Sequence, residues 1–284
     1  MDKRRITQII AAITTNANIN GFFTGSIYKG NMKKICVPGL NCYSCPGAVG
    51  SCPIGSLQAV IGTIKYNISL YVVGFMILFG VLFGRFICGW LCPFGLIQDL
   101  LYKVPSRKIK VKKEVNEVFK YFKYFILALF VIILPVFLTN EFGISPPYFC
   151  QYICPVGTLE GGVPLVLMIK SLRGSLGYLF VWKVFSLICI LVASIFIYRP
   201  FCRYICPLGA FYSLFNKISF YRYEVDKTKC INCGACTEKC KLNIAVYNNS
   251  NSAECIRCGE CIKICPTKSV MRRKMFPTSI GGGF

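Results

Sequence analysis

The residues most able to do chemistry are eight cysteines near the C-terminus. Two runs, CINCGACTEKC and CIRCGECIKICP, share the spacing C-x2-C-x2-C-x3-C. Three close thiolates can bind three irons of one [4Fe–4S] cube, while the fourth cysteine reaches the neighbouring cube. A pair of zinc knuckles is the alternative, but zinc needs only four ligands per site and usually two C-x2-C pairs. The double run therefore predicts two clusters, with these ligands: Cys230, Cys233, Cys236 and Cys265 for cluster 1, and Cys255, Cys258, Cys261 and Cys240 for cluster 2.

A second pattern, C-x3-C-P-x-G, occurs at residues 88–95, 150–157 and 202–209. Residues i and i+4 share one face of a helix, so both thiols of a unit can point at one ligand. The proline suits the first turn of a new helix, and a helix N-terminus favours a negative cluster. Cysteines packed as small apolar residues are the alternative. Two units on the same side predict one inner membrane cluster with these ligands: Cys88, Cys92, Cys202 and Cys206.

Six further cysteines lie in CVPGLNCYSCPGAVGSCPIG and in the middle C-x3-C-P-x-G unit. They suffice for one cubane and a spare pair, and CPIGSLQ echoes CPFGLIQ. We expect an outer thiol site in which four or more of these are ligands: Cys36, Cys42, Cys45, Cys52, Cys150 and Cys154. Disulfides compete with this expectation, because cysteines outside the membrane readily oxidise. Cys189, in the middle of an apolar run, is expected to be only a small apolar residue. No catalytic residue is predicted.

The elements that position these thiols belong to a membrane protein. Of 284 residues, 55% are hydrophobic, and the mean hydropathy is +0.56. Apolar runs at 68–87, 121–139 and 178–198 are long enough to cross a bilayer, which takes about 20 residues. Residues 6–28 are a poor first span or an interfacial helix, and the run at 163–169 can only be re-entrant or a buried helical turn.

Charge and composition narrow the function further. The chain has no histidine, which excludes haem with two histidine ligands, Rieske centres and Ser-His-Asp triads. The net charge of +22 suggests nucleic-acid binding, but the basic residues lie beside apolar spans, as in cytoplasmic loops of membrane proteins. Clusters held by four thiolates would also cancel part of this charge. We expect no nucleic-acid partner and no haem.

Two halves of the chain repeat each other. Cys36 and Cys150, Cys88 and Cys202, and Cys92 and Cys206 are each 114 positions apart. Tandem repeats that share sites at their interface are common in membrane transporters. We therefore predict a mainly α fold: a polytopic helical membrane domain with three to four spans and re-entrant helices in a tandem pseudo-repeat, over residues 1–222. An α+β ferredoxin domain with two [4Fe–4S] clusters follows at 223–270, and a basic tail at 271–284.

The motifs CGWLCPFG and CRYICPLG, together with the double ferredoxin run, resemble the NapH/NosR-type membrane polyferredoxins over nearly the whole chain. The resemblance implies passage of electrons between a cytoplasmic or quinol-side donor and a reductase outside. By the same resemblance, Cys88, Cys92, Cys202 and Cys206 match the membrane motifs of the family. The outer cysteines depart from the NapH core and suggest an added redox centre. A separate extracytoplasmic flavoprotein is expected to supply the flavin that NosR carries in its own domain.

The sequence therefore predicts a membrane-bound iron–sulfur electron carrier, an electron-transfer subunit of an oxidoreductase system. It is expected in the cytoplasmic membrane as a multi-pass protein, with the ferredoxin domain in the cytoplasm, because the basic loop at 102–123 faces that side. Its expected partners are redox proteins, among them a cytoplasmic ferredoxin or reductase, and the lipid bilayer. Three alternatives stay open: a quinol-linked donor with a quinone partner, a copper reductase of the respiratory-oxidase assembly type, and a redox sensor.

Overall fold

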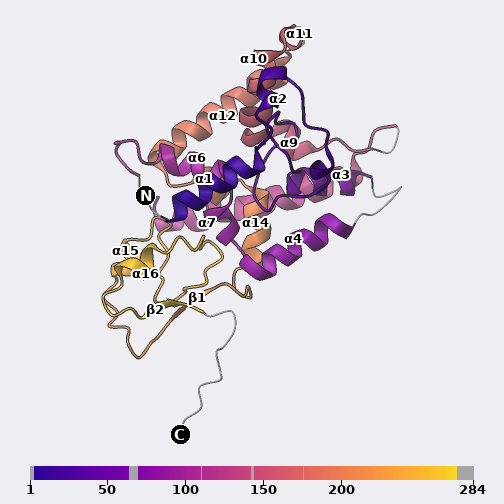
Figure 1. The fold of residues 1–284 in the computed structure, drawn as a ribbon. Helices are drawn as coiled ribbons and strands as arrows, with labels where there is room; N and C mark the ends of the chain where they lie inside the picture. Colours follow the sequence, from indigo (N-terminus) through magenta and orange to yellow (C-terminus); the bar gives the residue numbers. More distant parts are fainter. Residues whose placement is uncertain (1–2, 64–69, 110, 142–143, 175, 274–284) are drawn as a thin grey trace.

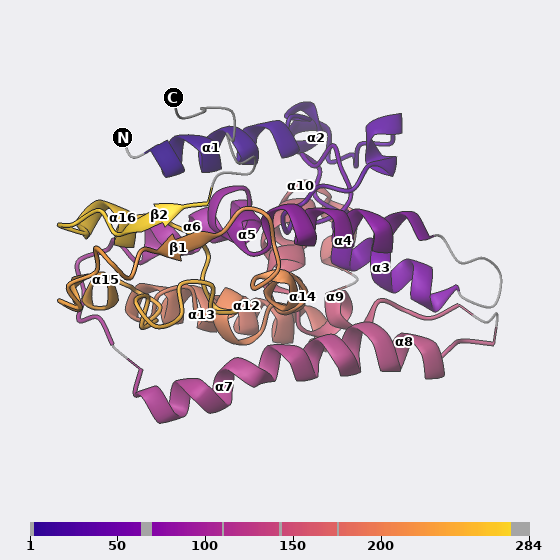
Figure 2. The same ribbon diagram turned by 90° about the horizontal axis from the view of Figure 1, so that it is seen from below.

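The computed structural model describes the chain except for residues 1–2, 64–69, 110, 142–143, 175 and 274–284. The described part is a helical body with a small segment of loops, short helices and one two-stranded sheet at one end (Figures 1 and 2). The first elements are α1 (Lys3–Thr15), α2 (Asn20–Thr24), η1 (Asn31–Lys34), α3 (Pro53–Gly62), α4 (Leu70–Phe83), α5 (Phe86–Trp90) and α6 (Pro93–Leu101).

The second half of the body repeats the alternation of long and short helices. Its elements are α7 (Lys113–Ile126), the π-helical η2 (Leu127–Ile133), α8 (Leu134–Phe137), α9 (Tyr148–Tyr152), the π-helical η3 (Gly157–Gly162), α10 (Val163–Met168), α11 (Lys170–Arg173), α12 (Tyr178–Phe196), α13 (Pro200–Tyr204) and α14 (Pro207–Phe215). The terminal segment follows with β1 (Tyr223–Val225), α15 (Ala235–Glu238), α16 (Glu260–Ile264) and β2 (Val270–Arg272), in which β1 and β2 pair antiparallel.

Two helices have the length and apolar composition of membrane spans. They are Glu114–Phe137, which joins α7, η2 and α8, and Tyr178–Phe196. Their exposed side chains include Phe122, Phe137 and Phe185, as expected of helices that face lipid. The predicted span at 68–87 is described only from residue 70, and α4 has 14 residues, about 21 Å of helix. That length is short of a 30 Å hydrocarbon core.

The remaining apolar segments also depart from simple spans. Residues 6–28 form α1 and α2 with a break between them, and α1 packs on α5 and α6. The run at 163–169 continues η3 as the six residues of α10 and ends at Met168. Both segments therefore pack as short pieces against the body.

The C-P-x-G motifs end one helix and begin another. Helices α3, α6 and α14 each begin at the proline of a motif, and the preceding cysteine has extended backbone. The first cysteine of each C-x3-C-P unit lies on a five-residue helix, α5, α9 or α13. The predicted helix start at the proline is thus confirmed in these three helices. The broken helices bring short backbone segments and helix N-termini into the centre of the body.

Candidate iron–sulfur sites

The pocket at predicted cluster 1 is formed by the terminal segment alone. It is lined by four thiols, those of Cys230, Cys233, Cys236 and Cys265. Gly234 has a φ of 75°, which turns the chain from the loop into α15 and favours glycine. Cys233 is exposed, so this pocket lies at the surface.

The predicted ligands of cluster 2 also gather in one place. Although burial is the largest cause of the raised pKa of Cys261, the neighbouring thiolates of Cys255, Cys258 and Cys240 raise it further, to about 12. These thiols pack with Ile256 in an apolar cluster. In the folded chain, the fourth cysteine of each run thus lies beside the first three of the other run, as the predicted ligand sets require.

The inner site consists of Cys88 on α5, Cys92 before α6, Cys202 on α13 and Cys206 before α14. All four thiols are buried. Burial raises the pKa of Cys206 most, and the charges of the other three thiols raise it further, because the four side chains are neighbours. The N–H of Gly209 donates to Sγ of Cys206 at 3.3 Å.

Two buried arginines cross between the halves of the inner site. Arg85 Nη2 donates to the carbonyl of Cys202 at 2.9 Å, and Arg199 Nη1 donates to the carbonyl of Cys88 at 2.5 Å. Each is 1% exposed. Their positive charges favour thiolates and a negative cluster beside them. Each is paired with a carboxylate: Arg85 with Glu254 at 2.7 Å and Arg199 with Asp99 at 2.5 Å.

The Asp99 carboxylate is fixed by these charges. Burial opposes its ionisation, but the guanidinium of Arg199, with help from that of Arg4, lowers the pKa of Asp99 to about 2. Arg4 comes from α1 and also donates from Nε to the carbonyl of Gly89 at 3.0 Å. Helix α1 therefore contacts the inner site through Arg4.

Four of the six candidate outer cysteines line one cavity. A cavity of about 610 Å³ is lined by the thiols of Cys42, Cys52, Cys150 and Cys154. Burial is the main cause of the raised pKa of Cys150, and the charges of Cys52 and Cys42 add to it. Lys183 Nζ donates to the carbonyl of Cys150 at 3.1 Å. The site therefore joins the N-terminal loop to the middle C-x3-C-P-x-G unit.

The other two candidates, Cys36 and Cys45, do not line this cavity. Cys36 is buried and accepts from the side chain of Ser56. Cys45 contacts Asn16, with Sγ to Oδ1 at 3.7 Å. Cys189 is exposed on the surface of α12, one of the two helices of membrane length.

Residues at matching positions of the repeated motifs make further contacts with the sites, which the sequence analysis did not assign. Gln98 Nε2 donates to Sγ of Cys202 at 3.0 Å, and Gln58 Nε2 donates to Sγ of Cys150 at 3.3 Å. The similarity of CPFGLIQ and CPIGSLQ could have indicated this role, because each segment ends in one of the two glutamines. Arg85 and Arg199 likewise stand 114 positions apart, three residues before the first cysteine of a unit.

The donor sets consist of thiols, which fit a cube of iron and sulfide. The glycines of the motifs leave a cradle: a Cβ on Gly55 would lie 3.9 Å from Sγ of Cys150, and one on Gly157 would lie 3.7 Å from Sγ of Cys42. All-thiolate donors with nearby backbone N–H groups suit [4Fe–4S] clusters.

Helices of membrane length, thiol-lined pockets and a ferredoxin segment define an iron–sulfur electron-transport protein of the ferredoxin type. Comparison with known proteins supports the same class. Residues 66–112, 122–163 and 179–222 match one family described as a 4Fe-4S binding domain, and residues 250–270 match a second of the same description. The chain belongs to the 4Fe-4S polyferredoxin family related to NosR, NirI, MauN and YccM, which confirms the NapH/NosR-type resemblance.

Individual relatives cover different shares of the chain. The uncharacterized protein MJ0750 of Methanocaldococcus jannaschii is 34% identical over 72% of this chain and 78% of its own length. The putative electron transport protein YccM of Escherichia coli is 27% identical over 62% of this chain and 46% of its own. The regulatory protein NosR of Stutzerimonas stutzeri is 30% identical over 57% of this chain, which spans 21% of that protein. No solved structure matches the chain.

Proposed function

We propose that this protein conducts electrons from its ferredoxin segment, through the inner and outer sites, to an acceptor beside the outer site. One observation carries the proposal: thiols of both sites lie in a single apolar core, and the inner site adjoins the loop of cluster 2. [4Fe–4S] clusters bound at the four sites supply one-electron transfer. The residues of the chain hold the sites at fixed separations and exclude water between them.

The first contact joins the ferredoxin segment to the inner site. Gly89, next to Cys88, lies against the carbonyl of Ile256, which belongs to the loop between Cys255 and Cys258. Trp90 Nε1 donates to the carbonyl of Arg257 at 3.0 Å. Cluster 2, rather than cluster 1, is therefore the ferredoxin site that adjoins the membrane domain.

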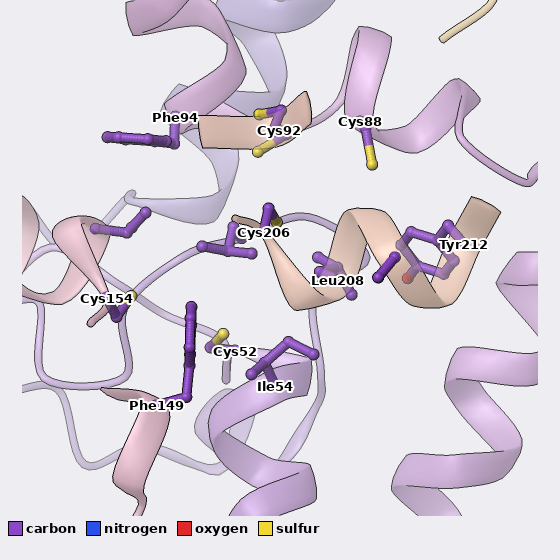
Figure 3. Close-up of a cluster of buried hydrophobic side chains, with 14 of the residues drawn as sticks. Cys52, Ile54, Cys88, Cys92, Phe94, Phe149, Cys154, Cys206, Leu208 and Tyr212 are labelled. Carbon is purple, nitrogen blue, oxygen red and sulfur yellow. The ribbon is translucent and has the colours of Figure 1, made fainter. Parts of the chain in front are cut away.

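The second contact joins the inner and outer sites. The N–H of Leu40 hydrogen-bonds the sulfur of Cys92, while Cys42, two residues further on, lines the outer cavity. Two residues of chain span at most about 7 Å. Figure 3 shows Cys206 and Leu208 between Cys88 and Cys92 of the inner site and Cys52 and Cys154 of the outer cavity. The outer motifs thus reach into the core of the body, so an electron would not have to cross the roughly 30 Å hydrocarbon layer in one step.

For orientation, we propose that the ferredoxin segment faces the cytoplasm and that the outer cavity opens toward the opposite side. The basic loop that precedes α7 supports this, because such loops stay on the cytoplasmic side. An acceptor protein, which the resemblance suggests is a flavoprotein, would then bind beside the outer cavity. Lys183 and Tyr43 lie among the residues at that cavity.

The experiment is a count of iron and acid-labile sulfide per purified chain, with EPR spectra of the reduced protein. The proposal requires about sixteen irons, four for each of four cubes. Cys42→Ser should remove about four irons and one EPR signal, and Cys206→Ser should do the same for the inner site. About eight irons would leave only the ferredoxin segment loaded and would refute the conduction path. Reduction of the clusters by a quinol, or copper-dependent activity, would favour the two rival roles.

A further inference from the structure

The two halves of the ferredoxin segment share one loop conformation. Asn232 and Arg257 have positive φ values of 53° and 54°, and Gly234 and Gly259 follow with 75° and 85°. The sequences Cys-Ile-Asn-Cys-Gly and Cys-Ile-Arg-Cys-Gly are nearly identical. Each loop therefore presents an isoleucine in the same position relative to its cluster site.

The surroundings of the two isoleucines differ. Ile256 is 2% exposed, because its loop is docked on the membrane domain. Arg257 fixes that loop: Nη1 donates to the carbonyl of Phe83 at 2.6 Å, and Nη2 donates to the carbonyl of Asn216 at 2.7 Å. The loop of cluster 2 is thus an occupied interface between two redox sites of one chain.

Ile231, the counterpart of Ile256, is 64% exposed. Cys233 beside it is also exposed, whereas both Ile256 and Arg257 are buried. Ile231, Asn232 and Cys233 together line the open pocket of cluster 1. The same loop is thus buried by the chain itself at cluster 2 and uncovered at cluster 1.

Positive charge surrounds the uncovered loop. The residues that flank the four cysteines of cluster 1 include four exposed lysines: Lys227, Lys229, Lys239 and Lys268. The acidic residues in the same stretches are Asp226, which lies 3.6 Å from Lys229, and Glu238. An apolar centre with a basic rim favours an acidic partner, because opposite charge steers association and fixes orientation.

We propose that the loop from Cys230 to Gly234 is the docking surface for a small acidic ferredoxin, with Ile231 at its centre. The inference rests on the proposed function, since it makes cluster 1 the terminal site of the path. On transfer, the reduced carrier loses one electron and the cluster 1 site gains it; no bond forms or breaks and no proton moves. Docking there repeats, between two proteins, the contact that Ile256 makes within this one.

The test measures binding without electron flow. Oxidised acidic two-cluster ferredoxin is titrated into the detergent-solubilised, cluster-loaded full chain by isothermal calorimetry, at low and at high salt. We expect Ile231→Asp, and separately the pair Lys227→Glu and Lys229→Glu, to weaken Kd by about tenfold or more. Salt should weaken the wild-type complex because the rim is charged. Lys170→Glu on α11, at the other end of the body (Figure 1), is the charge-reversal control and should stay within about twofold.

Iron content and dithionite-reduced EPR spectra of each variant check that cluster 1 is intact. Unchanged affinity in Ile231→Asp and in the lysine variant, with full iron content, would overturn the docking surface. A lysine effect without an effect of Ile231→Asp would also overturn it, since only a diffuse charge would then be involved. Normal binding in a chain that holds only about eight irons would leave the docking surface standing and refute the membrane path instead.

Discussion

The side-chain amide of Gln98 donates to the sulfur of Cys202 at 3.0 Å, from the other half of the repeat. Gln58 makes the equivalent contact with Cys150 at 3.3 Å. Each glutamine lies six residues after the cysteine of a C-P-x-G motif and reaches the first cysteine of a C-x3-C-P-x-G unit. The inner and outer sites are therefore built on the same plan, which supports the same ligand chemistry at both.

These glutamines should tune the two sites separately. A hydrogen bond to a thiolate stabilises the reduced site more than the oxidised one, because the reduced site is more negative. Gln98→Leu should lower the reduction potential of the inner site by roughly 40 mV, the equivalent of about 1 kcal/mol in a one-electron couple. EPR-monitored redox titration measures the shift. Gln58→Leu is the matched control: it should move the outer site and leave the inner one unchanged.

The outer cysteines should divide into two groups on mutation. Cys36→Ala, Cys45→Ala and Cys189→Ala should keep the iron content of the wild type, because these thiols do not line the outer cavity. Cys52→Ala or Cys154→Ala should lose about four irons. Iron and sulfide analysis reads the difference. Loss of iron from Cys36→Ala equal to that from Cys52→Ala would show that the ligand set is wrong.

Glu254 should be essential for docking of the ferredoxin segment. Its carboxylate pairs with Arg85 at 2.7 Å and also with Lys123, both of them buried. Glu254→Gln leaves two buried cations without their anion and should cost about 3–5 kcal/mol of unfolding free energy. Glu224→Gln is the control, because its exposed pairs with Arg222 and Arg273, at 3.4 and 3.5 Å, are worth at most about 1 kcal/mol. Denaturant unfolding compares the two.

The same ion cluster predicts a pH dependence. Burial opposes ionisation of Glu254, but Arg85 and then Lys123 lower its pKa below the usual 4.5. A lowered pKa in the folded state means that the stabilisation is complete above pH 4.5 and is lost as the pH falls below it. In the wild-type protein, limited proteolysis should release the ferredoxin segment faster at low pH than at pH 7. A Glu254→Gln protein should show a flatter profile, and an equally steep one would contradict the assignment.

Gly89 should tolerate no side chain at the same interface. A Cβ there would collide with the carbonyl of Ile256, whereas a Cβ on Gly74 of α4 would meet nothing within 4 Å. Gly89→Ala should therefore destabilise docking by about 1–3 kcal/mol. Gly74→Ala should be neutral or stabilising by up to about 1 kcal/mol, because alanine suits a helix interior better. Thermal unfolding that ranks the two variants in the opposite order would refute the contact.

Particular residues show how far the sequence could lead. The spacing of Cys230, Cys233 and Cys236 predicted a shared pocket, and the prolines predicted where α3, α6 and α14 begin. These predictions depend on local geometry, which a few neighbouring residues determine. The membrane-length helices at Glu114–Phe137 and Tyr178–Phe196 were also visible as long apolar runs. The end of α4 at Phe83, before the predicted end at residue 87, was not visible, because apolar composition does not report where a helix stops.

The amino-acid sequence by itself determined the chemistry that the sites can offer: sulfur as the ligand atom, and glycine and proline where a helix must break. Only the tertiary structure decided which thiols converge. It separated Cys42 from Cys36 and Cys45, made Arg85 and Arg199 reach across the repeat, and buried Ile256 while leaving Ile231 exposed. The reason is that contacts between residues about 100 positions apart depend on how helices pack, and spacing along the chain constrains only near neighbours.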